Sequence, residues 1–217
     1  MIKMDKCRDR EEWLLARGKR IGGSDAAAVV GMNPWMDTVK LWRIKTGKLI
    51  PDEIKDNPLV EYGNRAEPLL RELFILDHPD MILVYEPNNI WTNSRYPWAH
   101  ASLDGWLYDS KQNLGVLEIK TATISGAAQA AKWKDRVPDN YYCQILHYMA
   151  VTGAEFAILK AQLKYHQDDG GLTVRTLHYR FEWTDVQRDI EYLMQKEAEF
   201  WEHVEADTEP PLILPAI

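Results

Sequence analysis

The fold is decided by two stretches at hairpin distance, Ala101-Ser-Leu-Asp-Gly105 and Leu117-Glu-Ile-Lys-Thr121. In a strand, residues two apart point to the same face of the sheet, and the residue between them points to the other face. Glu118 and Lys120 are therefore expected to project together, while Ile119 turns toward a buried side. The second stretch thus predicts a carboxylate and an ammonium group side by side on a sheet.

Asp104 is the residue that makes a metal site beside this pair possible. Residues 109–113 are polar and lie between two strand-like segments, so we expect them to form the tip of a hairpin that brings Asp104 to the end of the neighbouring strand. The carboxylates of Asp104 and Glu118 can then meet in a hard-oxygen site of the kind that Mg²⁺ prefers. The alternative is an ordinary exposed strand face on which Glu118 and Lys120 form a cross-charge pair.

A third carboxylate, Glu67, occurs in an unexpected place. In a helix expected over residues 59–76, Glu67 shares an apolar stripe with Leu70 at helical spacing, so its side chain is aimed inward. Burying an unpaired carboxylate costs several kcal/mol, and the stripe therefore needs a partner for it. That partner is either a metal ion or an arginine of the same helix, Arg65 or Arg71.

Two further features accompany the carboxylates. Gln144 falls on the buried stripe of a helix expected over residues 140–151, where a satisfied core glutamine is the alternative. Arg20 to Asp25 places two glycines ahead of Ser24, the expected N-cap of a helix, and with Arg17 upstream this predicts a phosphate pocket or simply a tight turn. Trp35 follows in a nearby loop, where it can stack on an unpaired base.

The rest of the chain predicts one α/β domain with a meandering, mostly antiparallel sheet. We expect the last helix to begin after a cap at Thr184 and to end in a tail with Pro210, Pro211 and Pro215. The other expected helices cover residues 8–19, 24–30, 38–45 and 125–134, and the expected strands cover 81–85, 89–92, 98–101, 105–108, 115–120, 155–163 and 172–183.

Bulk composition narrows the class of protein. With 217 residues and 46% hydrophobic side chains, the chain fits one domain. A net charge of −7 argues against a protein that binds nucleic acid through a basic surface alone, although carboxylates that hold cations count as negative in this sum. Cys7 and Cys143 form no CxxC pair, and we expect neither a signal peptide nor a membrane span, so a cytoplasmic location is the default.

Taken in order, these residues resemble the lambda-exonuclease or YqaJ-type viral recombinase family, within the PD-(D/E)XK nuclease superfamily. The resemblance covers about residues 13–153 and implies an α/β fold with a restriction-endonuclease-like core, a central mixed sheet flanked by helices. The matching segments are Ile21-Gly-Gly-Ser-Asp25 with the three alanines that follow, Leu41-Trp42, Thr46-Gly47, Gly63-Asn-Arg-Ala-Glu67-Pro68, Ala101 to Gly105, Leu117 to Thr121 and Tyr142 to Met149.

The resemblance implies a metal centre. Asp104 and Glu118 would be ligands, with the Ile119 carbonyl as a third, and Glu67 would complete the site directly or through water. Lys120 would orient or activate the attacking water and stabilise charge at the phosphate. We expect Mg²⁺, with Mn²⁺ able to substitute and two ions per site, because the site lacks the His and Cys that favour zinc.

The resemblance also implies substrate contacts and partners. Gln144 would hold the catalytic arrangement, Arg17 and Ser24 would bind a terminal 5′-phosphate, and Ser102 is a further candidate there. The expected activity is 5′-to-3′ digestion of one strand of linear double-stranded DNA, which leaves a 3′ overhang for phage-type recombination. The expected assembly is a homotrimeric ring that works with a single-strand annealing protein in the cytoplasm of a bacterial host, encoded by a phage or prophage.

Two alternatives remain at this stage. A restriction- or repair-type endonuclease would share the same metal core, and the core residues do not exclude it. A non-catalytic DNA-binding module would be expected to lack an Asp, Glu or Lys of the core, and all are present. We expect a single exonuclease domain over 1–217, with a nuclease core over about 13–183 and a C-terminal helix and tail over 184–217.

Overall fold

The computed structural model describes residues 1–51, 57–166 and 170–214, and it contains two β-sheets and the helices that cover them. The expected helix over residues 38–45 is found at those bounds, and most other expected elements shift by a few residues. In chain order the elements are β1 (Ile2–Lys6), α1 (Arg10–Gly18), α2 (Gly23–Val29), α3 (Thr38–Lys45), α4 (Pro58–Asp77), β2 (Ile82–Val84), β3 (Asn89–Asn93), β4 (Tyr96–Ala101), β5 (Gly105–Tyr108), β6 (Leu114–Ile124), α5 (Ala127–Ala131), α6 (Asp139–Thr152), β7 (Phe156–His166), β8 (Leu172–Glu182) and α7 (Trp183–Glu205).

The large sheet is mixed, as the fold class requires. Its strand order is β2-β5-β6-β7-β8, and only the β6–β7 pair is parallel. A parallel pair needs a crossover connection, which here is the segment with α5 and α6. The crossover lays α6 against the sheet on the face that carries Glu118 and Lys120.

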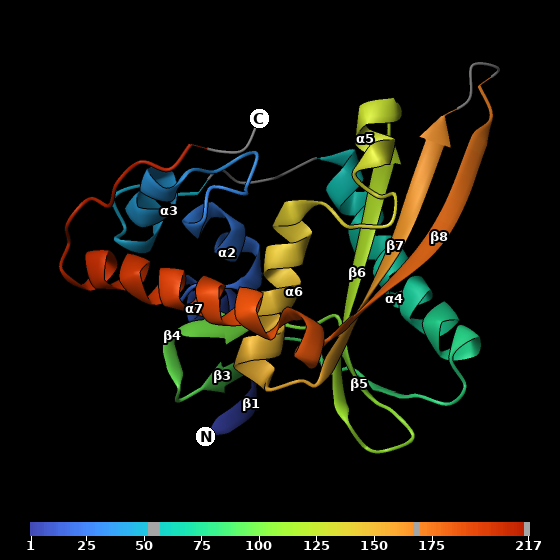
Figure 1. Cartoon of the computed structure of the whole chain (residues 1–217), viewed down its shortest axis with the longest axis horizontal. Coiled ribbons are helices and arrows are strands. Elements are labelled where there is room, and N and C mark those ends of the chain that lie inside the picture. The colour runs from blue at the N-terminus through green and yellow to red at the C-terminus, as the bar shows by residue number, and fades with distance from the viewer. Residues whose placement is uncertain (52–56, 167–169, 215–217) are drawn as a thin grey trace.

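Helices cover both faces of this sheet, as Figure 1 shows. On one face α4 packs its apolar stripe, with Leu70 and Phe74, against Leu117 and Ile119 of β6. On the other face α6 forms a larger core together with α2, α7 and the small sheet. The prediction that Ile119 turns away from Glu118 and Lys120 into a buried layer is confirmed.

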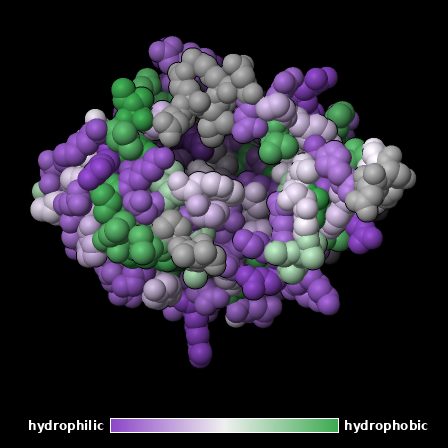
Figure 2. Space-filling view, turned by 90° about the horizontal axis from the view of Figure 1, so that it is seen from above, coloured by the Kyte–Doolittle hydropathy of each residue, from purple (hydrophilic) through white to green (hydrophobic). Residues whose placement is uncertain are grey.

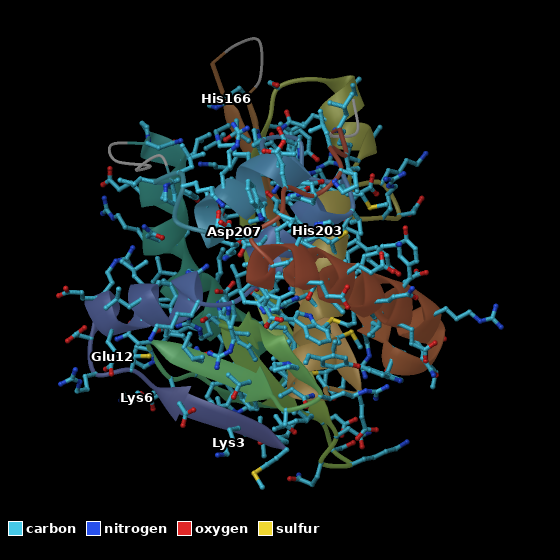
Figure 3. The ribbon with its side chains drawn as sticks, turned by 90° about the vertical axis from the view of Figure 1, so that its left-hand side faces the viewer. Lys3, Lys6, Glu12, His166, His203 and Asp207 are labelled. Atoms are coloured by element: carbon cyan, nitrogen blue, oxygen red, sulfur yellow. The ribbon has the colours of Figure 1, made fainter. Side chains whose placement is uncertain are left out.

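The meandering single sheet that we expected is wrong. The strands β3 and β4 pair with β1 in a separate three-stranded sheet. β1 was not predicted, although Ile2 to Asp5 alternates apolar and charged side chains, because the run is short and its pairing partner lies far along the chain; all five of its residues are exposed, so it buries no face of its own. Figure 3 shows Lys3 and Lys6 of this strand at the border of the molecule.

Two expected helix starts are also wrong. α2 begins at Gly23 with Gly22 as its cap, because the Asp25 carboxylate accepts the Gly22 amide at 3.0 Å and starts the helix earlier than a Ser24 cap would. α7 begins at Trp183 rather than after Thr184. The helix expected over 125–134 shortens to α5, and Pro215 lies outside the described residues.

β5 is shorter than β6, so one edge of β6 has no partner strand from Glu118 onward; this is the open edge of β6. Gly105 is the first residue of β5 and pairs with Leu117. From Glu118 onward, β6 is paired in the sheet through β7. Asp104, which directly precedes β5, uses its carboxylate to accept the Ile119 amide at 2.8 Å at this open edge. The hairpin tip over 109–113 is confirmed, and it sets this register.

A buried ion pair fastens α7 to α6. The His147 ring contacts the Glu197 carboxylate through Nδ1 and the His100 carbonyl through Nε2, both at 2.8 Å, and His147 and Glu197 are fully buried. Burial alone would lower the pKa of His147, but Glu197 outweighs it and the pKa is raised. Because both contacted atoms are acceptors, the ring donates from both nitrogens and carries a charge.

Cys7 and Cys143 are both free thiols. Among the helices in the described part of the chain, none combines the length and the apolar character needed to cross a membrane.

We predict that Glu197→Ala lowers the free energy of unfolding by about 3–5 kcal/mol, because it leaves a buried charged imidazole without its partner. The matched control is Glu199→Ala, which removes a surface pair with Lys196 and should cost less than about 1 kcal/mol. Urea unfolding followed by circular dichroism measures both. Equal midpoints for the two variants would show that the buried pair does not stabilise α7.

Candidate metal centre

Glu118 is the centre of the site and is almost fully buried, with 2% of its surface exposed. Its Oε1 accepts from Gln144 Nε2 at 2.7 Å and pairs with Lys120 Nζ at 2.5 Å. Its other oxygen, Oε2, is buried and has no hydrogen-bond partner among the described residues. A buried acceptor without a partner is costly, so this oxygen is a place where a ligand is expected.

Asp104 lies beside Glu118 at the open edge of β6. Its Oδ2 accepts the Ile119 amide at 2.8 Å, and its main-chain carbonyl accepts from Arg71 Nε at 2.7 Å. The hairpin geometry expected from the sequence therefore brings the two carboxylates together. Burial first, and the neighbouring Asp104 second, raise the pKa of Glu118.

Glu67 reaches the same region from α4 and forms an ion pair with Arg71. The alternative of an arginine partner on the same helix is thus realised in this structure, through Arg71 and not Arg65. The Arg71 guanidinium also lies over the Tyr85 ring at 3.5 Å. The four-residue spacing of Glu67 and Arg71 on one helix face predicts their pairing, and it also places Arg71 next to the site.

Burial raises the pKa of all three carboxyl groups, and the charge of Asp104 adds to this effect on Glu118 and Glu67. Burial first, and Asp104 second, raise the pKa of Glu118 to about 8 and that of Glu67 to about 7. Burial also raises the pKa of Asp104. Burial alone would lower the pKa of Lys120, but Glu118 and Asp104 outweigh it, so the pKa lies above its ordinary value and the amine is charged.

The residues present fit a divalent cation. Within the described ranges, no three His, Cys, Asp or Glu side chains lie close enough together to coordinate a metal ion by themselves. The site instead offers the unpartnered Glu118 Oε2, the adjacent Asp104 carboxylate, and Glu67 held by Arg71. All are hard oxygens, and a cation among them would offset the repulsion that raises their pKa values.

Gln144 belongs to the site through two donated hydrogen bonds. Its amide nitrogen donates to Glu118 and, at 2.9 Å, to the Tyr148 hydroxyl oxygen, and both α6 residues are buried. A Cβ placed on Gly23 would lie 2.4 Å from the Tyr148 ring and 2.9 Å from Gln144. Gly23 is thus required by the close packing of α2 on α6, which the sequence pattern had suggested only as a turn or a phosphate pocket.

The predicted phosphate and DNA contacts are spread around this centre. Arg17 lies over the Trp13 ring at 4.2 Å, and its charge partly offsets the effect of burial, which raises the pKa of Asp104. Ser24 is exposed in the first turn of α2. The Ser102 hydroxyl is already engaged, since it donates to a main-chain carbonyl at 2.8 Å and accepts from Trp13.

Trp35 is 72% exposed, in the loop between α2 and α3. A cavity of about 270 Å³ beside this loop is lined by Met32, Pro34, Lys132 and Arg136, among others. Seen from above, the molecule is hollowed near its centre (Figure 2). The exposed ring of Trp35 is thus accessible from outside the molecule.

Two sequence comparisons relate the chain to known proteins. Residues 12–155 match the model of the YqaJ-like viral recombinase domain. The curated "Uncharacterized protein YqaJ" of Bacillus subtilis (strain 168) is 29% identical over 201 residues. That alignment covers 88% of this chain and 55% of the relative, so the chain spans about half the length of that protein.

Solved structures share the fold at low sequence identity. The alkaline exonuclease LHK-Exo from Laribacter hongkongensis is similar with a TM-score of 0.60 and 19% identity, over 91% of this chain and 93% of that chain. A phage-related exonuclease from Haemophilus somnus 129PT is similar with a TM-score of 0.53 and 10% identity, over 87% and 96%. These neighbours confirm the fold class, a mixed sheet flanked by helices.

We predict a pH-dependent difference in stability between the wild-type chain and Glu118→Gln when metal is removed with EDTA. The ordinary pKa of 4.5 is raised to about 8 by folding, so the folded state binds more protons than the unfolded state between these values. The stability of the wild type relative to the variant should therefore fall as the pH rises through this range, by up to about 1.4 kcal/mol per pH unit.

Urea unfolding at several pH values measures this difference. Glu61→Gln, on the exposed side of α4, is the control and removes a carboxylate from the same chain without touching the site. A difference between wild type and Glu118→Gln that stays constant with pH would contradict the buried, repelled carboxylate described above.

Proposed function

The chain belongs to the YqaJ-like viral recombinase domain family, and we propose that it is a metal-dependent DNA exonuclease. The observation that carries this proposal is the open edge of β6, where Asp104 and Glu118 meet beside the charged Lys120 and one Glu118 oxygen lacks a partner. Family membership supports DNA as the substrate, and the exonucleases that share the fold support hydrolysis from an end.

Asp104, Glu118, Glu67 and the Ile119 carbonyl would hold Mg²⁺, or Mn²⁺ in its place, with two ions per site. When bound, such ions supply charge neutralisation at the phosphate and a water of lowered pKa. The chain's own contribution is to hold these oxygens close together despite their repulsion. The Ile119 amide and the Gln144 amide fix one oxygen each on Asp104 and Glu118, which leaves the second oxygen of each for a cation.

Lys120 acts through its charge. Burial alone would lower its pKa, but the Glu118 and Asp104 carboxylates outweigh burial and raise it, so the amine carries a positive charge beside them. A fixed ammonium beside the phosphate stabilises the negative charge that grows on the phosphate oxygens in the transition state. Its contact with Glu118 and its position over the Tyr141 ring hold it in place for that task.

The finer features of the reaction rest on the family. We propose 5′-to-3′ digestion of one strand of linear double-stranded DNA to leave a 3′ overhang, with Arg17 and Ser24 at the terminal 5′-phosphate. Trp35 and Ser102 are further candidates for DNA contact. A homotrimeric ring and a single-strand annealing partner belong to the same proposal, which the recombinase family supports.

The direct test compares linear 5′-phosphorylated duplex with covalently closed circular duplex in Mg²⁺. An exonuclease degrades the linear DNA and leaves the circle intact. Rapid loss of the circle would favour the restriction- or repair-type endonuclease instead, and no loss of either in Mg²⁺ or Mn²⁺ would favour a non-catalytic module.

We predict that Lys120→Ala lowers the cleavage rate by about 10²–10³-fold or more, because it removes the fixed charge that stabilises the transition state. Binding of duplex DNA, measured by fluorescence anisotropy in Ca²⁺, should remain close to that of the wild type. Lys111→Ala in the hairpin tip is the control for loss of one positive charge. Normal turnover by Lys120→Ala would refute the role given to this amine.

We predict that removing the 5′-phosphate slows digestion and that Arg17→Ala abolishes this preference. Arg10→Ala is a matched control, because Arg10 lies over the same Trp13 ring on the same helix at 5.8 Å. The ratio of rates on phosphorylated and unphosphorylated duplex measures the effect. An unchanged ratio in Arg17→Ala would exclude this residue from the phosphate pocket.

A further inference from the structure

Arg71 makes three contacts with three different parts of the chain. Its Nε donates to the Asp104 main-chain carbonyl at 2.7 Å, its Nη2 pairs with Glu67, and its guanidinium lies over the Tyr85 ring at 3.5 Å. Its side chain is only 11% exposed. Because the Arg71 side chain is largely buried and makes all three contacts, it is held in one position.

These contacts join two elements that carry carboxylates. Glu67 belongs to α4, and Asp104 belongs to the turn between β4 and β5. Asp104 is held at both ends, since Arg71 fixes its carbonyl and the Ile119 amide fixes one carboxylate oxygen. Arg71 therefore links the Glu67 carboxylate on α4 to the main chain of Asp104.

Two further polar contacts join α4 to the sheet within the described residues. Near its start, the Tyr62 hydroxyl bonds Gln162 of β7 at 2.6 Å, and at its end Asp77 pairs with the buried Lys160 of β7 at 3.2 Å. Both bonds hold the helix on the sheet and contact no residue of the metal centre. Arg71 lies between them and is the one of the three that reaches Asp104.

The geometry suits arginine and not lysine. A planar guanidinium presents several donors in fixed directions, so it can meet a carbonyl and a carboxylate at once while one face lies on an aromatic ring. A lysine carries the same charge on a single nitrogen and cannot keep all three contacts. The substitution Arg71→Lys therefore keeps the positive charge but loses the contact geometry, so it separates the effect of one from the effect of the other.

We propose that Arg71 is a positioning residue of the metal centre, which holds the Glu67 side chain beside Asp104 so that both residues can serve a divalent cation. The inference rests on the proposed function, because it concerns the same carboxylates. A guanidinium that only neutralised Glu67 would compete with the cation, and its removal would strengthen metal binding. Removal of a positioning residue would instead weaken metal binding.

The test is Mn²⁺ binding to the full chain without DNA, measured by calorimetry, for wild type, Arg71→Lys and Arg71→Ala. We expect both variants to bind Mn²⁺ about tenfold or more weakly, the usual cost of losing a residue that orients metal ligands. Arg65→Ala and Tyr62→Phe are the controls, since one removes an exposed pair with Glu61 and the other an α4 anchor away from the site. Both controls should keep wild-type affinity.

Melting temperatures show whether each variant folds. If Arg71→Ala does not fold, Tyr85→Leu serves in its place, because it removes the ring and keeps both hydrogen bonds, and its affinity should fall between those of wild type and Arg71→Lys. Equal or tighter Mn²⁺ binding by folded Arg71 variants would overturn the positioning role while leaving the metal centre intact. A wild-type chain that binds no Mn²⁺ would overturn the metal centre, and the role of Arg71 with it.

Discussion

The enclosure of neighbouring carboxylates in one site is the constraint on which the rest of this structure depends. Burial raises the pKa values of Asp104, Glu118 and Glu67, and the charge of Asp104 raises those of Glu118 and Glu67 further. Such a cluster is unfavourable alone, and the fold offsets it with two cations, Lys120 and Arg71, and with donated hydrogen bonds. A cluster that lowers the stability of the folded chain in this way is typical of a functional site.

The architecture can be understood as support for this cluster. A short β5 leaves the edge of β6 open where the carboxylates meet, and the β6–β7 crossover brings α6 and Gln144 onto the same face. Tight packing at Gly23 fixes α2 against that helix. α7, which lies beyond the segment that matches the family, holds α6 from behind through Glu197 and His147, so the C-terminal helix belongs to the support of the site.

The sequence predicted what local spacing and strand alternation determine. Asp104, Glu118 and Lys120 were placed together because a hairpin and a two-residue period require it. The exposed β1 strand and the division into two sheets depend on pairing between distant segments, which no local pattern records. The early start of α2 depends on Asp25, whose side chain also pairs with Lys45 of α3, a contact that only the folded chain reveals.

The central claim is that these oxygens gather around a divalent cation. A crystal grown with Mn²⁺ tests it most directly, because the anomalous scattering of manganese locates the ion without reference to any model of the site. The account predicts a peak in contact with carboxylate oxygens of both Asp104 and Glu118, with Glu118 Oε2 among them. A crystal with Mn²⁺ bound elsewhere, or with those oxygens too far apart to share an ion, would contradict it.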